Sequence, residues 1–398
     1  LGFLGFFKYF NFFLDNFKDA FSLFGYDITT SSLNIVLPVG ISFYTFQTLS
    51  YTIDVYNNKL QPTKDFMSFA AFVSFFPQLV AGPIERATNL LPQFHKKRFF
   101  DYQSAILGLR QILWGLFKKV VIADNCATYA NEIFNNHEQY GGTTLILGAL
   151  FFTFQIYGDF SGYSDIAIGT SRLFGFKLMK NFAFPYFSRD IAEFWRRWHI
   201  SLSTWFRDYL YIPLGGSRGG TRIKVRNTFI IFIVSGFWHG ANWTFIIWGA
   251  LNAIYFLPLL LRKKNRVNTG AIAANRLFPK SHELKGIFIT FTLTVLAWIF
   301  FRAENLTHAF SYILNLFSGL IEYIHYYKTY RELITLDKLF ILSFIIFIIV
   351  EWLGRSKEFA IEHIFPQYRV IRYAFYYIIA FLIIYNLGKP QEFIYFQF

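Results

Sequence analysis

The run from Asn227 to Leu261 constrains the fold most, because it contains no Asp, Glu, Lys or Arg. A helix needs about 20 mostly apolar residues to cross the hydrocarbon core of a bilayer, so this run is long enough for a hairpin of helices. His239 nevertheless lies inside it, in the stretch SGFWHGANWTF (235–245). An ionisable side chain is costly to bury there unless it is partnered or neutral, which makes His239 a functional candidate.

The composition extends this interpretation to the whole chain of 398 residues, of which 54% are hydrophobic, with 54 Phe, 25 Tyr and 9 Trp. Long continuous runs such as KLFILSFIIFIIVEWLG (338–354) are typical of membrane helices and not of the short alternating strands of a barrel. The sequence therefore predicts an all-α polytopic membrane protein that forms a single domain over residues 1–398. Its apolar runs lie near 1–24, 33–56, 66–84, 103–123, 143–176, 227–261, 284–301, 338–354 and 370–388.

The net charge of +14 comes from 38 basic and 24 acidic residues, and the basic residues gather beside apolar runs, as in HKKR (95–98), RIKVR (222–226) and RKKNR (262–266). Such clumps mark the cytoplasmic ends of membrane helices, and they lack the periodic basic face of a nucleic-acid binder. Cys126 is the single cysteine, which excludes an intrachain disulfide and argues against a cysteine-based metal site. The chain begins at Leu1 without a secretory leader, and we expect the natural N-terminus to lie upstream.

Two stretches are too polar, or too rich in Pro and Gly, to face lipid. LPVGISFYTFQTLSYTIDVY (37–56) carries Gln47 and Asp54, and FFPQLVAGPIER (75–86) has two prolines and ends in a charged pair. Irregular backbone at membrane depth is tolerated where it is buried in protein or lines a cavity. Both stretches therefore predict broken or re-entrant helices in the protein interior.

The stretch SRDIAEFWRRWHISLSTWFRDYLY (188–211) predicts one amphipathic helix. At about 100° per residue its large apolar side chains share one face, and two arginines lie opposite. Asp190, with Glu193 three residues on, resembles an N-cap with its reciprocal partner. Such a helix lies in the membrane interface or lines a cavity, and His199 falls at the seam between its two faces.

The basic flanks of the uncharged run, Arg226 and Arg262, place both of its ends on the cytoplasmic side. A helix from Arg226 would carry His239 about 20 Å inward. The hairpin then needs a break near Gly240, and we expect a polar cavity or tunnel around the imidazole. The alternative is a packed neutral histidine that donates to a helix carbonyl.

Two histidines in membrane-embedded segments, His199 and His239, suggest a metal site or acid–base catalysis. A zinc site needs three or four ligands, and no HxxxH spacing, cysteine or carboxylate motif accompanies either residue, so we expect no metal. General base catalysis needs only one imidazole that stays neutral. A further polar stretch, YGDFSGYSDIAIG (157–169) with Asp159 and Asp165, fits either helix packing through Gly and Ser or a polar lining for an acceptor or a proton path.

FWRRWHISLSTWFRDYLYIPLGGSRGG (194–220) and GFWHGANWTFIIWGAL (236–251) together resemble the membrane-bound O-acyltransferase superfamily, in its alginate O-acetyltransferase-like branch. FKYFNFF (7–13), QIYGDFSGYSDIAIGTSRLFGF (155–176) and the terminal FIYFQF extend the resemblance along the chain. The related D-alanyl transfer proteins share FWRRWH and WHG. Alginate-like members commonly carry a histidine after the WG pair, where this chain has Asn252, which puts a third functional histidine in doubt.

The resemblance implies a multi-helix bundle in the inner (cytoplasmic) membrane that encloses a tunnel. An acyl group, by preference acetyl, would pass from a cytoplasmic thioester such as acetyl-CoA toward the hydroxyls of an extracytoplasmic polysaccharide, with an esterase-like partner protein outside. His239 would be the catalytic base, and His199 would orient the donor or donate to the developing oxyanion. The substrate- and donor-binding residues that we expect are Trp195, Arg196, Arg197, Ser203, Arg207, Trp238, Asn242 and Asp159. The arginines among them would attract donor phosphates, with interfacial snorkelling as the alternative.

Two other classes of function stay open at this point. A transporter would use the polar intramembrane residues as a permeation path, although the sequence shows no inverted repeat in support. An inactive scaffold that recruits a partner is disfavoured by the presence of both His199 and His239. The sequence does not disclose the acceptor, because neighbouring branches of the superfamily serve peptidoglycan or teichoic acid, the latter by D-alanyl transfer.

Overall fold

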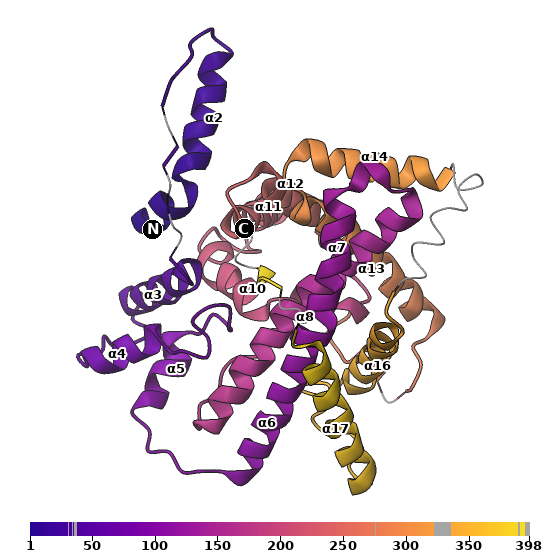
Figure 1. Cartoon of the computed structure of the whole chain (residues 1–398). Helices are drawn as coiled ribbons and strands as arrows, with labels where there is room; N and C mark the ends of the chain where they lie inside the picture. The colour runs from indigo at the N-terminus through magenta and orange to yellow at the C-terminus, as the bar shows by residue number, and fades with distance from the viewer. Residues whose placement is uncertain are drawn as a thin grey trace.

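Two helices packed against each other form the centre of the molecule, α6 (Tyr102–Leu116) and α8 (Gly142–Leu173) (Figure 1). The structure is a computed structural model that describes residues 1–398 except 31, 34, 36, 37, 275, 322–335, 389–390 and 395–398. Every regular element in the described residues is a helix, which confirms the predicted all-α class. The apolar run predicted over 143–176 is α8 itself.

Glycines bring the backbones of α6 and α8 into contact. A Cβ at Gly115 would lie 2.6 Å from the carbonyl oxygen of Gly162, and a Cβ at Gly162 would lie 2.8 Å from the carbonyl oxygen of Gly115. Any larger side chain at either position would force the helices apart. Small residues at such crossings are the usual means by which membrane helices associate closely.

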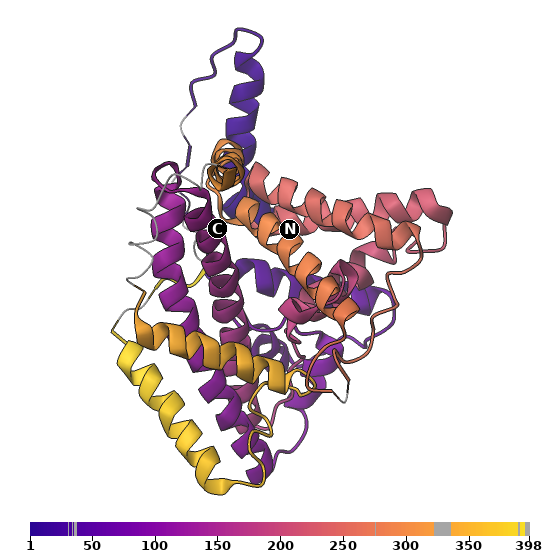
Figure 2. The ribbon, with the colours of Figure 1, turned by 90° about the vertical axis from the view of Figure 1, so that its right-hand side faces the viewer.

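The uncharged run forms a hairpin of two antiparallel helices, α11 (Gly220–His239) and α12 (Trp243–Leu261). The two helices lie side by side and run outward from the centre of the molecule (Figure 2). Gly236 of α11 and Gly249 of α12 each lie so close to a carbonyl of the other helix that a Cβ would overlap it. The predicted break falls at Gly240, between the two helices.

The other elements after α6 pack around this centre. The π-helical segment η2 (Phe117–Ala123) continues α6 into α7 (Asp124–Asn135), and both contact α8. The C-terminal helices contact α8 or η2 and are α13 (Ser281–Arg302), α14 (Leu306–Ile321), α16 (Lys338–Gly354) and α17 (Arg369–Asn386). The sequence did not predict α14, because Ser, His and Asn interrupt its apolar residues, and its buried side chains such as Tyr312 are spaced along one face.

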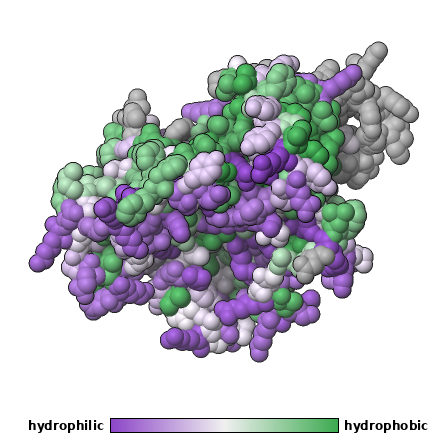
Figure 3. Space-filling view, turned by 90° about the horizontal axis from the view of Figure 1, so that it is seen from below, coloured by the Kyte–Doolittle hydropathy of each residue, from purple (hydrophilic) through white to green (hydrophobic). Residues whose placement is uncertain are grey.

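Four of the described helices are long and apolar enough to cross a membrane, judged by length and composition: α8, α12, α13 and α17. Seen from below, the surface carries a broad hydrophilic band beside hydrophobic areas (Figure 3). The loop between α5 (Ala87–Phe94) and α6 lies at this lower end in Figure 1, and its residues Lys96, Lys97 and Arg98 are exposed. These features fit a multi-pass membrane protein with charged ends.

The N-terminal part stands out from the bundle as a helix and a returning arm (Figure 1). Several large apolar side chains of this part are exposed, among them Phe13 and Phe17. The segment 74–86 contains the predicted irregular stretch FFPQLVAGPIER, which follows α4 without regular helix and is buried over residues 81–86. The elements of this part are α1 (Gly2–Leu4), η1 (Gly5–Tyr9), α2 (Phe10–Ser22), α3 (Ile41–Tyr56) and α4 (Phe66–Val73).

The single amphipathic helix predicted over 188–211 is wrong. The chain forms α9 (Ile191–Arg197), an extended residue at Trp198, a left-handed residue at His199, and then α10 (Ile200–Phe206) with the π-helical segment η5 (Arg207–Tyr211). The predicted N-cap is confirmed, because Asp190 accepts the backbone N–H of Glu193 at 2.7 Å. The interruption places His199 at a break between two helices, and His239 also lies at such a break.

Candidate active site

His239 is the last residue of α11, and the chain leaves the helix at Gly240 in an extended conformation. The next helix begins at Trp243, after the N-cap Asn242, whose side chain accepts the backbone N–H of Thr244 at 3.0 Å. This N-cap and the glycine together explain why the hairpin breaks there. Asn242, predicted as a binding residue, thus serves as the cap of α12.

The end of α11 is capped by a separate part of the chain. The last carbonyls of a helix have no partner within it. Here Lys8 Nζ donates to the carbonyls of Trp238 at 2.9 Å and His239 at 2.8 Å, and Tyr9 Oη donates to that of Phe237 at 3.0 Å. A cation at a helix C-terminus also interacts favourably with the helix dipole. The FKY motif therefore fixes the backbone that carries His239.

His199 is the residue between α9 and α10, and its backbone lies in the left-handed region at φ 43° and ψ 55°. For a residue other than glycine this conformation costs about 1–3 kcal/mol, and such strained residues gather at functional sites. The break is held by an extended strand-like segment, since Ile200 N donates to Asn181 O and Ala183 N donates to Arg197 O, both at 2.9 Å. The imidazole of His199 consequently leaves the helical face that the sequence predicted for it.

The two breaks bring the two imidazoles together, and we call His199 and His239 the histidine centre. Their ring centroids are 6.5 Å apart, and their exposed fractions are 1% and 7%. At this separation the ring nitrogens are beyond the roughly 2.7–3.2 Å of a direct hydrogen bond. Among the residues that the structure describes, no three His, Cys, Asp or Glu side chains are grouped to hold a metal ion.

Aromatic rings enclose the histidine centre. Around His239, the ring centroids of Trp238, Trp248 and Phe301 lie at 4.9, 5.3 and 5.2 Å. Phe160 of α8 stands edge-on to His199 at 4.6 Å. Burial among aromatic rings favours neutral imidazoles, because taking a charged group out of water is costly. Trp195, predicted to shape a tunnel wall, contacts the same enclosure through Trp248 at 5.7 Å.

Two of the three predicted donor-binding arginines donate to backbone carbonyls outside their own helix. Arg196 donates to backbone carbonyls in the loop 265–268, at 2.8 and 2.9 Å. Arg197 pairs with the buried Glu193 of the same helix at 2.9 Å and donates to the carbonyls of Ala183 and Gly270 at 3.1 and 3.2 Å. Both side chains therefore tie α9 to its surroundings.

Three other predicted binding residues lie away from the imidazoles or are used in local contacts. Arg207 pairs with Asp208 at 2.7 Å and keeps 60% of its side chain exposed. The Ser203 hydroxyl donates to the carbonyl of Trp198 at 3.3 Å, within the second helix break. Asn242 Nδ2 donates at 2.7 Å to a carbonyl that follows α13.

Asp159 belongs to a second polar group, which we call the ion-pair centre: Lys118, Lys119, Asp124, Asp159 and Asp165. Lys119 Nζ lies 2.8 Å from both the Asp159 and the Asp124 carboxylates. Lys118 Nζ lies 2.6 Å from the Asp165 carboxylate. The second oxygen of Asp159 accepts a backbone N–H of the C-terminal segment at 2.7 Å.

The stretch 157–169 makes close contacts with the neighbouring helical segments α6 and η2. A Cβ at Gly158 would lie 2.9 Å from the carbonyl oxygen of Lys118, and one at Gly169 would lie 2.6 Å from that of Gly108. The carboxylates of the stretch are paired with lysines of η2, on the packed side of α8. These contacts favour helix packing as the role of this stretch.

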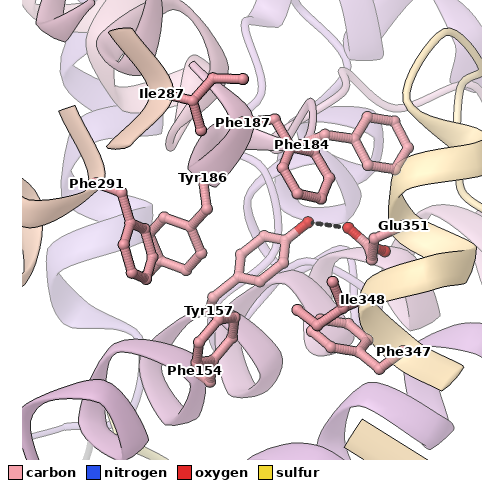
Figure 4. A pocket seen from close by; sticks show the side chains of 10 residues that line it. All are labelled: Phe154, Tyr157, Phe184, Tyr186, Phe187, Ile287, Phe291, Phe347, Ile348 and Glu351. Carbon is pink, nitrogen blue, oxygen red and sulfur yellow. Dashed lines mark hydrogen bonds between the residues drawn. The ribbon is translucent and has the colours of Figure 1, made fainter. Parts of the chain in front are cut away.

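A cavity of about 220 Å³ is lined by residues that include neither His199 nor His239 (Figure 4). Its walls are mostly aromatic, and its buried carboxylate, Glu351, accepts hydrogen bonds from Tyr157 Oη at 2.6 Å and Trp114 Nε1 at 2.9 Å. Tyr157 lies 6.2 Å from Trp198, ring to ring. The cavity is thus apolar, and its one carboxylate already has hydrogen-bond partners.

The family model of the membrane-bound O-acyltransferase family, MBOAT, matches residues 61–265, which contain both histidines. The chain belongs to the membrane-bound O-acyltransferase family. This result confirms the resemblance drawn from FWRRWH and GFWHG. It also agrees with the all-helical fold and its membrane-spanning helices.

Within this family, the chain is 46% identical over 316 residues to a protein of Pseudomonas aeruginosa described as probable alginate O-acetylase AlgI, covering 79% of this chain and 58% of that protein. It is 41% identical over 337 residues to a peptidoglycan O-acetyltransferase of Helicobacter pylori, covering 77% and 60%. It is 33% identical over 293 residues to a teichoic acid D-alanyltransferase of Streptococcus thermophilus, covering 69% of each. The chain thus spans about three fifths of the length of the alginate and peptidoglycan relatives.

Several residues of the enclosure were not predicted from the sequence. Trp248 and Phe301 come from α12 and α13, and nothing in their local sequence distinguishes them from other aromatic residues of apolar helices. Lys8 was visible as a cation within an apolar run, which is itself a functional signal in a membrane protein. Asn181 lies in the segment before α9 and contacts His199 at 3.1 Å, a contact that only the fold reveals.

Proposed function

We propose that this chain is a membrane O-acyltransferase that moves an acyl group, by preference acetyl, from a cytoplasmic thioester toward a hydroxyl of an extracytoplasmic polysaccharide. The observation that carries the proposal is the pair of buried imidazoles 6.5 Å apart, each at a helix break, inside an aromatic enclosure. Membership of the acyltransferase family and the similarity to alginate and peptidoglycan O-acetylating proteins support it.

In the proposed reaction the acceptor hydroxyl oxygen attacks the thioester carbonyl carbon. A C–O bond forms and the C–S bond breaks. His239 accepts the hydroxyl proton, and the proton then passes to the leaving thiolate, so that an ester and a thiol are released. A placed general base contributes about 10²- to 10⁴-fold to the rate. The enclosure keeps water out and the imidazole neutral, so that it can accept the proton.

The donor in this proposal is acetyl-CoA or a similar thioester that enters a tunnel from the cytoplasmic side. Arg207 is the candidate contact for its phosphates, because Arg196 and Arg197 are engaged within the protein whereas Arg207 keeps 60% of its side chain exposed. Trp195 and Trp238 would shape the tunnel wall near the histidines. The chain itself would lie in the inner membrane of the cell, and an extracytoplasmic esterase-like partner would complete delivery to the polymer.

The test is transfer by the purified protein in proteoliposomes. Acetyl-CoA with a labelled acetyl group is supplied on one side, and an alginate-type oligosaccharide, with or without a candidate partner, on the other. Labelled ester on the oligosaccharide supports the proposal. If label is transferred only when D-alanyl carrier protein replaces acetyl-CoA, the donor is reassigned. If it is transferred only when a peptidoglycan fragment replaces the oligosaccharide, the acceptor is reassigned. Passage of unmodified substrate across the membrane without any ester formed would indicate that the protein is a transporter and not an enzyme.

A further inference from the structure

Asn181 is fully buried between α8 and α9 and contacts His199 with its side chain. Its Oδ1 lies 3.1 Å from His199 Nδ1, 2.9 Å from the Ser201 hydroxyl and 3.4 Å from the Ser201 backbone nitrogen. Its Nδ2 donates to the Ser164 hydroxyl of α8 at 3.1 Å. One amide therefore joins His199, the start of α10 and the central helix α8.

The surroundings of this amide determine which way it points. A backbone N–H can only donate, so the Asn181 atom that faces the backbone nitrogen of Ser201 must be the oxygen. The Ser201 hydroxyl already accepts the backbone N–H of Ile84 at 3.0 Å and gives its own hydrogen to Asn181. A reversed amide would point its N–H₂ group at the Ser201 backbone N–H.

The orientation of the amide fixes the proton on His199. Because Asn181 Oδ1 only accepts, His199 Nδ1 must carry the hydrogen between them. A neutral imidazole has one hydrogen on its two nitrogens, so Nε2 has the free lone pair. Within the described part of the chain, the buried Nε2 has no hydrogen-bond partner. His199 thus presents a hydrogen-bond acceptor.

We propose that Asn181 is a positioning residue, which holds His199 as the Nδ1–H tautomer so that Nε2 accepts a hydrogen bond from an N–H group of the donor thioester. This inference rests on the proposed function and chooses between the two roles expected for His199. A nitrogen without a hydrogen cannot donate to the developing oxyanion, whereas it can orient a donor that carries amide N–H groups. Proton acceptance from the hydroxyl stays with His239.

The direct test is the tautomer itself, in the wild-type protein. Histidine ring nitrogens are labelled with ¹⁵N, the protein is held in detergent or nanodiscs at neutral pH, and the His199 signals are assigned by their loss in His199→Gln. We expect a protonated Nδ1 and an unprotonated Nε2. A protonated Nε2 overturns the inference, whether or not the protein transfers acyl groups. This readout separates failure of the inference from failure of the proposed function.

Variants of Asn181 test the consequence for donor use. Asn181→Ala frees the ring to adopt the other tautomer, and we expect kcat/KM for the donor to fall about 10- to 100-fold, mainly through KM. Asn181→Asp keeps an acceptor at Nδ1, so donor use recovers to within about threefold at alkaline pH. Its carboxylate also stabilises the imidazolium, so the acid limb of the pH profile moves up by about one unit.

The matched control is Asn252→Ala, because Asn252 is also a buried asparagine but donates to a backbone carbonyl of its own helix, α12. We expect this variant to keep the wild-type pH profile and donor KM. If Asn181→Ala keeps them as well, the positioning role is contradicted. The same holds if Asn181→Asp is as impaired as the alanine variant at every pH.

Discussion

The histidine centre and the ion-pair centre are both polar groups buried in an apolar helical protein, and they differ in the partners of their polar atoms. In the ion-pair centre, Lys119 lies 2.8 Å from two carboxylates and Lys118 lies 2.6 Å from a third. In the histidine centre, the rings are surrounded by aromatic side chains, and His199 Nε2 has no hydrogen-bond partner among the described residues.

We infer from this difference that the ion-pair centre contributes to the stability of the fold and the histidine centre to the reaction. A buried charge that has its partner holds two elements together, and removing the partner leaves an uncompensated charge. A buried neutral nitrogen with a free lone pair adds little to stability but can accept a proton or a hydrogen bond from a substrate. We therefore expect substitutions in one centre to change folding and those in the other to change the rate of transfer.

The largest expected effect on the rate comes from His239→Ala. Transfer per folded molecule should fall about 10²- to 10⁴-fold, because the variant removes the proposed base while the backbone capped by Lys8 is retained. Label transfer in proteoliposomes measures the rate, and thermal unfolding checks the fold. A folded variant with wild-type transfer would remove His239 from the reaction.

Lys119→Met should have the largest effect on stability, a loss of about 3–5 kcal/mol, because it leaves the carboxylates of Asp159 and Asp124 buried without their cation. Reversible denaturation in mixed micelles measures it. Adding Asp159→Asn should restore part of the loss, since one uncompensated charge is removed. Equal stability of the single and double variants would show that the pairing contributes nothing.

A smaller effect on the rate is expected from His199→Gln. Losing the acceptor leaves a buried N–H of the donor unsatisfied, which costs about 1–3 kcal/mol, or roughly a 5- to 150-fold fall in kcat/KM. Steady-state kinetics with varied donor should place most of the change in KM. A fall confined to kcat would instead indicate a direct role in proton transfer.

The smallest effect is expected from Lys8→Met, which removes the cation from the end of α11. The interaction of a cation with a helix C-terminus is worth about 0.3–2 kcal/mol, so the free energy of unfolding should fall by about that amount and the rate of transfer only severalfold. Lys18→Met, on the same N-terminal region but paired with Asp15 at 3.7 Å, is the control and should behave as wild type. Equal effects of the two variants would show that capping by Lys8 has no role.

The break at His239 could be predicted from sequence and the break at His199 could not, for a physical reason. Gly240 and the N-cap Asn242 are local signals that end one helix and start the next. Around His199 no glycine or proline interrupts the helical pattern. The break there depends on backbone hydrogen bonds to Asn181 and Ala183, and on packing that compensates a left-handed residue.

The same distinction applies to the rest of the fold. The helices α8 and α16 were predicted from their long apolar runs, because a segment within a membrane must pair its own backbone N–H and C=O groups, as a helix does. Asp159 could not be assigned, because a carboxylate in an apolar run looks the same in sequence whether it meets a substrate or a lysine. The structure gives it Lys119.

The most direct measurement of the central claim is the rate of labelled acetyl transfer per folded molecule, for His239→Ala and Lys119→Met side by side with wild type. We predict that His239→Ala is stable and nearly inactive, while Lys119→Met is unstable but close to wild type in each molecule that remains folded. A His239→Ala variant that transfers at the wild-type rate would contradict the claim that the histidine centre performs the reaction.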